Sequence, residues 1–336
     1  MVITIPRTNV VAQRPHRTCD VGSVGATAYA TGRLMGTSCQ VRATGPNPRE
    51  ALSAVDVAWE AVAECERLWS RFLNDSELTL LNKCAMAAPF EVGVSDLTAD
   101  LIAAMLWAYT YSEGWVDASL LPQIVAAGYD RDFDELDTVV PPPRNRLLLD
   151  RYAGMSAVSL AGNRLMRSKP VLLDSGGVGK GLAADLVAES IVRGGASGAL
   201  VDLGGDIRAI GTDQHDRPWL VTAANEANPE SEDVGSWNVT DAGIATSSKA
   251  RRRWQGGHHL IDPHTGRPST SDLLAVTVVS SDALVAEVSA KSALLMGQYA
   301  AVDWLRERGA TAILTGLDGT LTRVDRESAT SADTED

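Results

Sequence analysis

The sequence lacks an excess of basic residues and any long apolar run. Its 336 residues include 30 Lys and Arg against 43 Asp and Glu, which gives a net charge of −13. Broad binding to nucleic acid or to an anionic membrane surface requires clustered Lys and Arg, so the composition argues against both. No apolar run reaches the roughly 20 residues of a membrane-spanning helix. The short basic run at residues 249–253 is either a solvated loop or a local contact for an anionic ligand.

Cysteine is also scarce, and its spacing fits neither a zinc site nor a disulfide framework. The four cysteines are Cys19, Cys39, Cys65 and Cys84. Residues 1–20 lack the apolar core and the small-residue cleavage site of a secretion signal. We therefore expect a cytoplasmic protein with reduced thiols.

Hydrophobic residues make up 45% of the chain, which is ordinary for a globular protein with a real core. Helical and strand patterns are mixed without regular βαβ alternation, and this predicts an α+β fold with mixed sheets flanked by helices. Residues 1–32 and 326–336 are expected to be a flexible N-terminal tail and a disordered C-terminal tail. The expected helices cover residues 46–72, 98–112, 182–191, 283–296 and 298–306; the main expected strands cover residues 35–43, 171–173, 199–210, 219–223, 237–240, 274–280, 311–315 and 320–324.

The most informative stretch is residues 171–185, VLLDSGGVGKGLAAD. Three apolar residues lead into Asp174, a glycine-rich turn follows, and the apolar spacing after the turn is that of a helix face. A strand, a glycine turn and a helix in this order aim free backbone N–H groups at an anion, and Lys180 adds a cation. Neither a Walker A loop nor a dinucleotide fingerprint fits, because Gly181 and Leu182 stand where those motifs need other residues. A phosphate-binding loop and a plain connection without ligand both remain open.

Further motifs follow one another along most of the chain. They are Met35-Gly36-Thr37; Arg71-Phe72 with Asp75-Ser76-Glu77-Leu78 and Asn82; residues 174–181; Leu203-Gly204-Gly205-Asp206; residues 259–263 with Thr265-Gly266; and Leu295-Met296-Gly297. In this order the set resembles the ApbE family of FAD:protein FMN transferases. The resemblance covers residues 33–325 and implies one ApbE-like domain, with a T-fold-like, two-lobed architecture and the flavin site between the lobes.

The resemblance implies that FAD is the substrate. Its pyrophosphate is cleaved, FMN passes through a phosphoester bond to a Thr or Ser of an acceptor protein, and AMP is released. Such a transfer needs positioning, neutralisation of negative charge and an acceptor for the hydroxyl proton. Two alternatives remain: a pyrophosphatase that splits FAD to FMN and AMP, and a non-catalytic FAD-binding protein. The glycine spacing disfavours a Rossmann oxidoreductase.

His259 is the candidate catalytic base, since the family places a His here and a neutral imidazole accepts a proton near neutral pH. The alternative is that His259 fixes its loop by hydrogen bonds to Asp262. For Met35 and Phe72 the alternative is core packing, and for Lys180 it is a surface position at a helix start. The residues that the resemblance implies as FAD contacts are Met35, Phe72, Trp115, Val116, Asp117, Asp174, Lys180 and Leu260.

One helix departs from the family pattern. The family usually carries Asp and, four residues later, Thr, which help to hold Mg²⁺ near a backbone carbonyl of the glycine turn; here these positions are Glu287 and Lys291. Gly177 and Glu287 are then the implied metal contacts, since Glu also offers hard oxygen ligands, whereas a protonated Lys cannot ligate. Either Glu287 and Lys291 form a helix ion pair, or the Lys291 ammonium sits where the cation would be.

Residues 20–27, DVGSVGAT, resemble the segment that these enzymes modify, Asp-x-x-Ser/Thr-Gly-Ala-Thr, with Val24 as one extra residue. The implied partner is an acceptor protein with a Ser/Thr-Gly-Ala-Thr-like motif. Self-modification at Thr27 is a further hypothesis, and a chance match in a flexible tail is its alternative.

Overall fold

The computed structural model describes residues 20–131, 152–254 and 257–325. Its centre is a nine-stranded sheet in the order β1-β2-β3-β7-β8-β11-β16-β17-β18, in which every neighbouring pair is antiparallel. The strands are β1 (Asp20–Val24), β2 (Thr27–Leu34), β3 (Thr37–Thr44), β7 (Gly198–Leu203), β8 (Asp206–Gly211), β11 (Asp241–Ser248), β16 (Leu273–Ser280), β17 (Thr311–Gly316) and β18 (Leu321–Val324).

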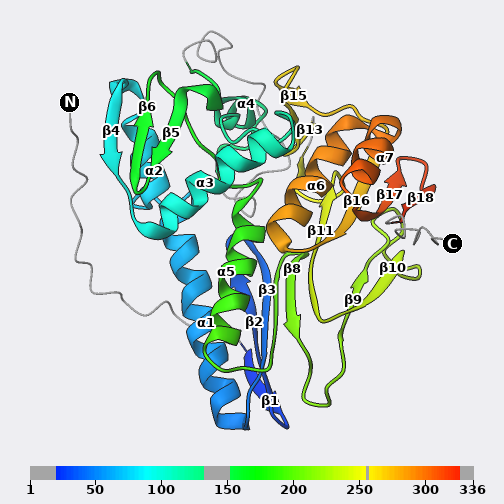
Figure 1. Ribbon diagram of the computed structural model, residues 1–336. Helices are drawn as coiled ribbons and strands as arrows, with labels where there is room; N and C mark the ends of the chain where they lie inside the picture. Colours follow the sequence, from blue (N-terminus) through cyan, green and yellow to red (C-terminus); the bar gives the residue numbers. More distant parts are fainter. Residues whose placement is uncertain (1–19, 132–151, 255–256, 326–336) are drawn as a thin grey trace, which may run out of the picture.

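Helices cover one face of this sheet (Figure 1). The helix α1 (Pro48–Trp69) packs on β2 and β3, α5 (Gly179–Arg193) packs on β7 and β8, and α6 (Ala283–Met296) packs on β11 and β16. Alternate strand residues face opposite ways, so Val201 belongs to the helix-side core while Leu200 packs against Trp219 on the other face. There β9 (Trp219–Ala223) and β10 (Gly235–Val239) pair with each other.

A smaller part lies beyond one end of α1 and α5 (Figure 1). It contains the three-stranded sheet β4-β6-β5, with α2, α3 and α4 nearby. The bounds of the remaining elements are α2 (Glu77–Lys83), β4 (Phe90–Gly93), α3 (Asp96–Tyr111), α4 (Leu121–Ala126), β5 (Val158–Ala161), β6 (Arg164–Arg167), β12 (Arg253–Trp254), β13 (Gly257–His258), β14 (Ile261–Asp262), β15 (Arg267–Pro268), α7 (Gln298–Glu307) and the 3₁₀ turns Ala85–Ala87 and Met155–Ala157.

Local sequence explains the helix ends. The Asn47 side chain caps α1 by accepting hydrogen bonds from the N–H groups of Arg49 and Glu50. The helix ends at Trp69, before the predicted Phe72, because Ser70 adopts an extended conformation. Helix α6 begins and ends as predicted, and the Asp282 side chain caps it by accepting from the Val285 N–H. The predicted α+β class is confirmed; the division into two lobes stays a prediction.

Two predictions about extended segments are wrong. Residues 20–32 are not a tail, because β1 pairs with β2 at the edge of the large sheet. Most of β1 is exposed, so no buried alternation marks it as a strand. Residues 199–210, expected as a buried strand broken at Gly204-Gly205-Asp206 by a bulge or a close backbone approach, form instead a hairpin of β7 and β8, turned at Gly204 and Gly205 with positive φ. The rest of both predicted tails, residues 1–19 and 326–336, lies outside the described residues.

Across residues 20–131, 152–254 and 257–325, no helix has both the length and the apolar character of a membrane span. Cys39, Cys65 and Cys84 are free thiols, and Cys19 lies outside the described residues.

Candidate active site

A polar cavity lies where the glycine turn, the first turn of α5, α6 and the β2–β3 turn come together. It consists of two adjoining hollows of about 110 and 310 Å³. Four basic side chains line both hollows: Lys180, Arg252, His259 and Lys291. Every residue implied from the sequence lines one of these hollows or a smaller one beside them: Met35, Phe72, Trp115, Val116, Asp117, Asp174, Gly177, Lys180, His259, Leu260 and Glu287. Leu260 reaches the cavity at its edge, since the residue itself is 1% exposed.

The glycine turn is shaped by side chains from two other segments. The Asp174 carboxylate accepts from the Gly176 N–H at 2.8 Å and pairs with Arg71 Nε at 2.8 Å. The Asn82 amide bonds both the N–H and the C=O of Leu173, each at 2.8 Å. The predicted strand at residues 171–173 is not formed in this described part of the chain. The Asn82 side chain holds the segment at Leu173 instead.

Phe72 belongs to an aromatic group at the cavity wall. The Arg71 guanidinium lies 4.2 Å from the Phe72 ring centroid and 4.4 Å from that of Tyr129. Trp254 continues this group, with its ring centroid 5.8 Å from that of Tyr129. Phe72 remains partly exposed beside the cavity, so core packing does not describe its position.

Met35 combines a core contact with a cavity position. Met35 and Gly36 form the two-residue turn between β2 and β3, with φ values of 53° and 65°. Two positive φ values are typical of a type I′ hairpin turn, and only Gly adopts them without strain. The Met35 N–H donates to Glu66 Oε1 at 2.7 Å, which fixes the strained residue against α1.

Lys180 is not a surface residue. Its side chain is 19% exposed, pairs with Asp206 Oδ2 and lies 3.8 Å from Glu287 Oε1. Burial lowers the pKa of Lys180 to about 8, against the Glu287 carboxylate, which raises it. The sequence alternative of a solvated lysine at a helix start is therefore wrong.

The His259 imidazole has a ring nitrogen that no other group of the described fold contacts by a hydrogen bond. Its Nδ1 is buried and has no hydrogen-bond partner among the described residues. Burial holds the pKa of His259 well below its ordinary value, and the charges of Arg252 and Lys291 act in the same direction. Asp262 instead accepts from the backbone N–H of His264 at 2.8 Å. The geometry favours a free neutral base over an imidazole that fixes its loop through Asp262.

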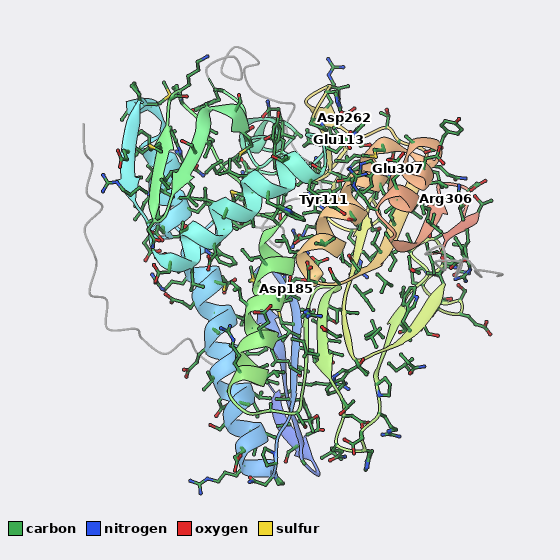
Figure 2. The ribbon with its side chains drawn as sticks, in the orientation of Figure 1. Tyr111, Glu113, Asp185, Asp262, Arg306 and Glu307 are labelled. Carbon is green, nitrogen blue, oxygen red and sulfur yellow. The ribbon has the colours of Figure 1, made fainter. Side chains whose placement is uncertain are left out.

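The helices α5 and α6 are tied together where they meet the site. The Asp185 carboxylate accepts from the N–H groups of Ala283 and Leu284 at the start of α6 (Figure 2). A Cβ on Gly181 would come within 2.6 Å of the Ala283 carbonyl oxygen, so this close contact requires glycine. As a result the Gly181 N–H donates to Glu287 Oε2 at 2.8 Å.

The donor set does not fit the Mg²⁺ that the family pattern implies. One Glu287 oxygen accepts from Gly181 and the other faces the Lys180 ammonium. The Lys291 ammonium donates to the Gly176 carbonyl at 3.3 Å. Mg²⁺ requires about six oxygen ligands in octahedral geometry. In the part of the chain that the structure describes, no three His, Cys, Asp or Glu residues are grouped to hold a metal.

Asp117 and Trp115, two of the implied FAD contacts, form interactions within and beside the loop that lies next to the glycine turn. The Asp117 carboxylate accepts from the N–H and hydroxyl of Ser119, and the Asp174 N–H donates to the Ala118 carbonyl at 2.8 Å. Trp115 contacts the His264 ring, with centroids 4.5 Å apart. These bonds place the loop of Asp117 against the glycine turn.

Sequence reasoning missed three residues that the fold brings to the cavity: Arg71, Tyr129 and Arg252. The motif containing Arg71 was recognised, but its ion pair with Asp174 was not. The basic run at residues 249–253 was the available signal for Arg252. Tyr129 carried no signal, because its ring reaches Arg71 from a distant segment.

Several known proteins are similar to this chain over most of its length. The model of the ApbE family matches residues 35–314. The FAD:protein FMN transferase of Salmonella typhimurium is 26% identical over 297 residues, covering 86% of this chain and 84% of that protein. That of Treponema pallidum is 28% identical over 313 residues, covering 86% and 85%.

Solved structures show the same fold. The flavin transferase ApbE from Vibrio cholerae superposes with a TM-score of 0.76 at 22% identity, covering 89% of this chain and 97% of that one. The ApbE protein from Thermotoga maritima gives a TM-score of 0.76 at 22% identity, covering 90% and 97%. With the family model matching most of its length, the chain belongs to the ApbE family.

Proposed function

We propose that the protein transfers the FMN part of FAD to a Ser or Thr hydroxyl of an acceptor protein and releases AMP. The observation that carries this proposal is the meeting of three cations, Lys180, Arg252 and Lys291, with the unpartnered imidazole of His259 on one cavity. A diphosphate is the part of FAD that needs such cations, and a hydroxyl nucleophile needs such a base. Curated relatives named FAD:protein FMN transferase support the same activity.

The step follows from these positions. The acceptor oxygen forms a bond to the phosphorus on the flavin side, and the bond from that phosphorus to the bridging oxygen breaks. The bridging oxygen leaves with AMP, and the hydroxyl proton passes to the His259 imidazole. The cations of Lys180, Arg252 and Lys291 neutralise the charge that develops on the departing phosphate. The rings of Phe72 and Tyr129, which line one hollow, offer a face to one of the two ring systems of FAD.

The acceptor is proposed to be another protein with a Ser/Thr-Gly-Ala-Thr-like motif. Thr27 of the same molecule is a poor candidate, because its hydroxyl lies 3.2 Å from that of Thr44. It also stands at the opposite end of β2 from Met35, roughly 25 Å away at about 3.3 Å per residue. Modification of Thr27 would therefore need a second copy of the chain. A cytoplasmic location stays part of the proposal.

Incubation of the purified protein with FAD and an acceptor that carries the motif tests the function. FMN attached to the acceptor, detected by intact mass, supports the transferase. Free FMN and AMP without an adduct would instead indicate a pyrophosphatase. FAD that is bound but intact would indicate a binding protein.

A further inference from the structure

Lys291 rests on the glycine turn at the floor of the cavity. Its Nζ donates to the Gly176 carbonyl at 3.3 Å. A Cβ on Gly177 would come within 2.6 Å of the same Nζ, so glycine at this position leaves room for the ammonium. The cation is therefore held at the Gly176 carbonyl, one residue before Gly177, which the resemblance implies as the metal contact.

Glu287 does not neutralise this ammonium through a direct ion pair. Within the described residues, Glu287 lies at ion-pair distance from Lys180, at 3.8 Å, and not from Lys291. Its other oxygen accepts from the Gly181 N–H at 2.8 Å. The helix ion pair considered from the sequence is thus wrong, although the two residues are four apart on α6.

Charged groups of both signs surround Lys291, and burial lowers the pKa of its ammonium. The carboxylates that act on it are Glu287 and Asp174, and Asp174 already pairs with Arg71. Two cations that line the same two hollows, Arg252 and Lys180, also act on it. The carboxylates of Glu66, Asp174, Asp206 and Glu287 also line the two hollows. Asp174 pairs with Arg71 and Asp206 with Lys180, so Arg252 and Lys291 are the cations that an anion would meet without a carboxylate at ion-pair distance among the described residues.

Building on the proposed function, we propose that the Lys291 ammonium replaces the divalent cation, so that this chain binds the diphosphate of FAD and transfers FMN without Mg²⁺. The ammonium donates N–H hydrogen bonds to non-bridging phosphate oxygens while the bond to the bridging oxygen breaks. It carries one positive charge where Mg²⁺ carries two, and Arg252 and Lys180 supply the remainder. No electron or atom beyond those of FAD and the acceptor hydroxyl takes part.

Binding of FAD to the intact wild-type chain gives the first test, because it needs no substitution. The affinity is measured from the change in flavin fluorescence after treatment with EDTA and again with added Mg²⁺. We expect the two affinities to agree within about twofold, since the cation is part of the chain. A wild type that loses FAD affinity in EDTA and regains it with Mg²⁺ would overturn the proposal.

Two substitutions sharpen this test. In EDTA, Lys291→Met is expected to bind FAD about tenfold more weakly or worse, because it loses a charged hydrogen-bond donor. Lys291→Thr is expected to be equally weak in EDTA but to recover with Mg²⁺, because its hydroxyl and Glu287 are hard oxygen ligands. The matched control is Lys169→Met, which removes an exposed lysine outside the cavity and should leave FAD affinity unchanged.

The outcomes separate this inference from the proposed function. Unimpaired binding by Lys291→Met in EDTA, or an equal response of wild type and Lys291→Thr to Mg²⁺, overturns the inference whatever the transfer activity. Metal-independent binding that requires Lys291, with no FMN on any acceptor, supports Lys291 as the replacement for the cation in FAD binding and contradicts FMN transfer, both in the proposed function and in this inference. Thermal unfolding of each variant shows whether a loss of binding comes from a loss of fold. The wild-type titration in EDTA and in Mg²⁺ tests metal independence even if every variant fails to fold.

Discussion

Two groups of positive side chains border the same cavity, and their partners differ. Arg71 has several partners: it pairs with Asp174, donates to the Tyr129 carbonyl at 2.9 Å and lies over the faces of two aromatic rings. Lys291 and Arg252 have weaker partners, since their hydrogen bonds among the described residues go to the backbone carbonyls of Gly176 and Gly36, at 3.3 and 3.4 Å. Lys180 lies between these cases, with Asp206 as its partner.

The difference in partners distinguishes cations that stabilise the fold from cations that bind the ligand. A buried cation with a close carboxylate has its charge satisfied inside the fold, and its loss should lower stability. A cation that meets only carbonyl oxygens keeps charge for an incoming anion, and its loss should lower FAD affinity. Arg71 therefore builds the wall, while Arg252 and Lys291 act on the ligand.

The largest effect is expected at His259, whose buried Nδ1 has no hydrogen-bond partner among the described residues. His259→Gln should lower the rate of FMN transfer by about 10²–10⁴-fold, because the acceptor hydroxyl loses its proton acceptor. FAD affinity should change by only a few-fold, since the cations remain. Transfer is measured by intact mass of the acceptor, and His215→Gln, at an exposed loop position, is the control. Full transfer by His259→Gln would remove the base from the mechanism.

Arg71 should show the opposite profile. Arg71→Met leaves the Asp174 carboxylate without its cation at a site where the two side chains are 9% and 11% exposed. We expect the free energy of unfolding to fall by about 3–5 kcal/mol. The control is Arg67→Met, which removes an exposed pair with Glu64 and should cost less than about 1 kcal/mol. Urea unfolding measures both, and equal losses would contradict the distinction between the two groups.

Lys180 should make FAD binding depend on pH. Burial depresses its pKa to about 8, so its charge is present below that pH and is lost as the pH rises through it. A bound diphosphate favours the protonated form and raises the pKa, so FAD affinity should fall above about pH 8, by up to about tenfold per unit. Lys180→Arg stays charged and should show a weaker fall. A fall of equal size in this variant would assign the titration to another group.

The smallest effect is expected at Phe72, whose ring contacts Arg71 and also lines the cavity. Phe72→Leu keeps an apolar side chain but removes a ring, and aromatic contacts contribute about 0.5–1.5 kcal/mol. FAD affinity should therefore fall only a few-fold, with a change in unfolding free energy of the same small size. An unchanged affinity with a large loss of stability would restore the core-packing interpretation.

The sequence was sufficient for the elements with a strong local pattern. Helix α6 was predicted with its observed bounds, because Asp282 caps it and Gly297 follows it. Strand β1 could not be predicted, because it is mostly exposed and its order comes from pairing with β2. Residues 171–173 read as a strand because they are apolar, but Asn82, far away in the sequence, supplies the hydrogen bonds that a neighbouring strand would give.

The site, like the fold, has features that the sequence predicted and features that it did not. The resemblance pointed to His259, Lys180 and Asp174, and the fold brings all three to one cavity. The partners of each cation were not predictable, because they depend on which distant oxygens come within reach. Neither the pairing of Lys180 with Asp206 nor the contact of Lys291 with Gly176 follows from spacing along the chain.

The central claim is that the cations around the glycine turn hold the diphosphate of FAD beside His259. The most direct measurement is a comparison of FAD and riboflavin binding to the same protein, because riboflavin has the flavin ring but no phosphate. FAD should bind at least about a hundredfold more tightly, the effect of about two charged hydrogen bonds. Equal affinities, or no affinity for FAD, would contradict the claim.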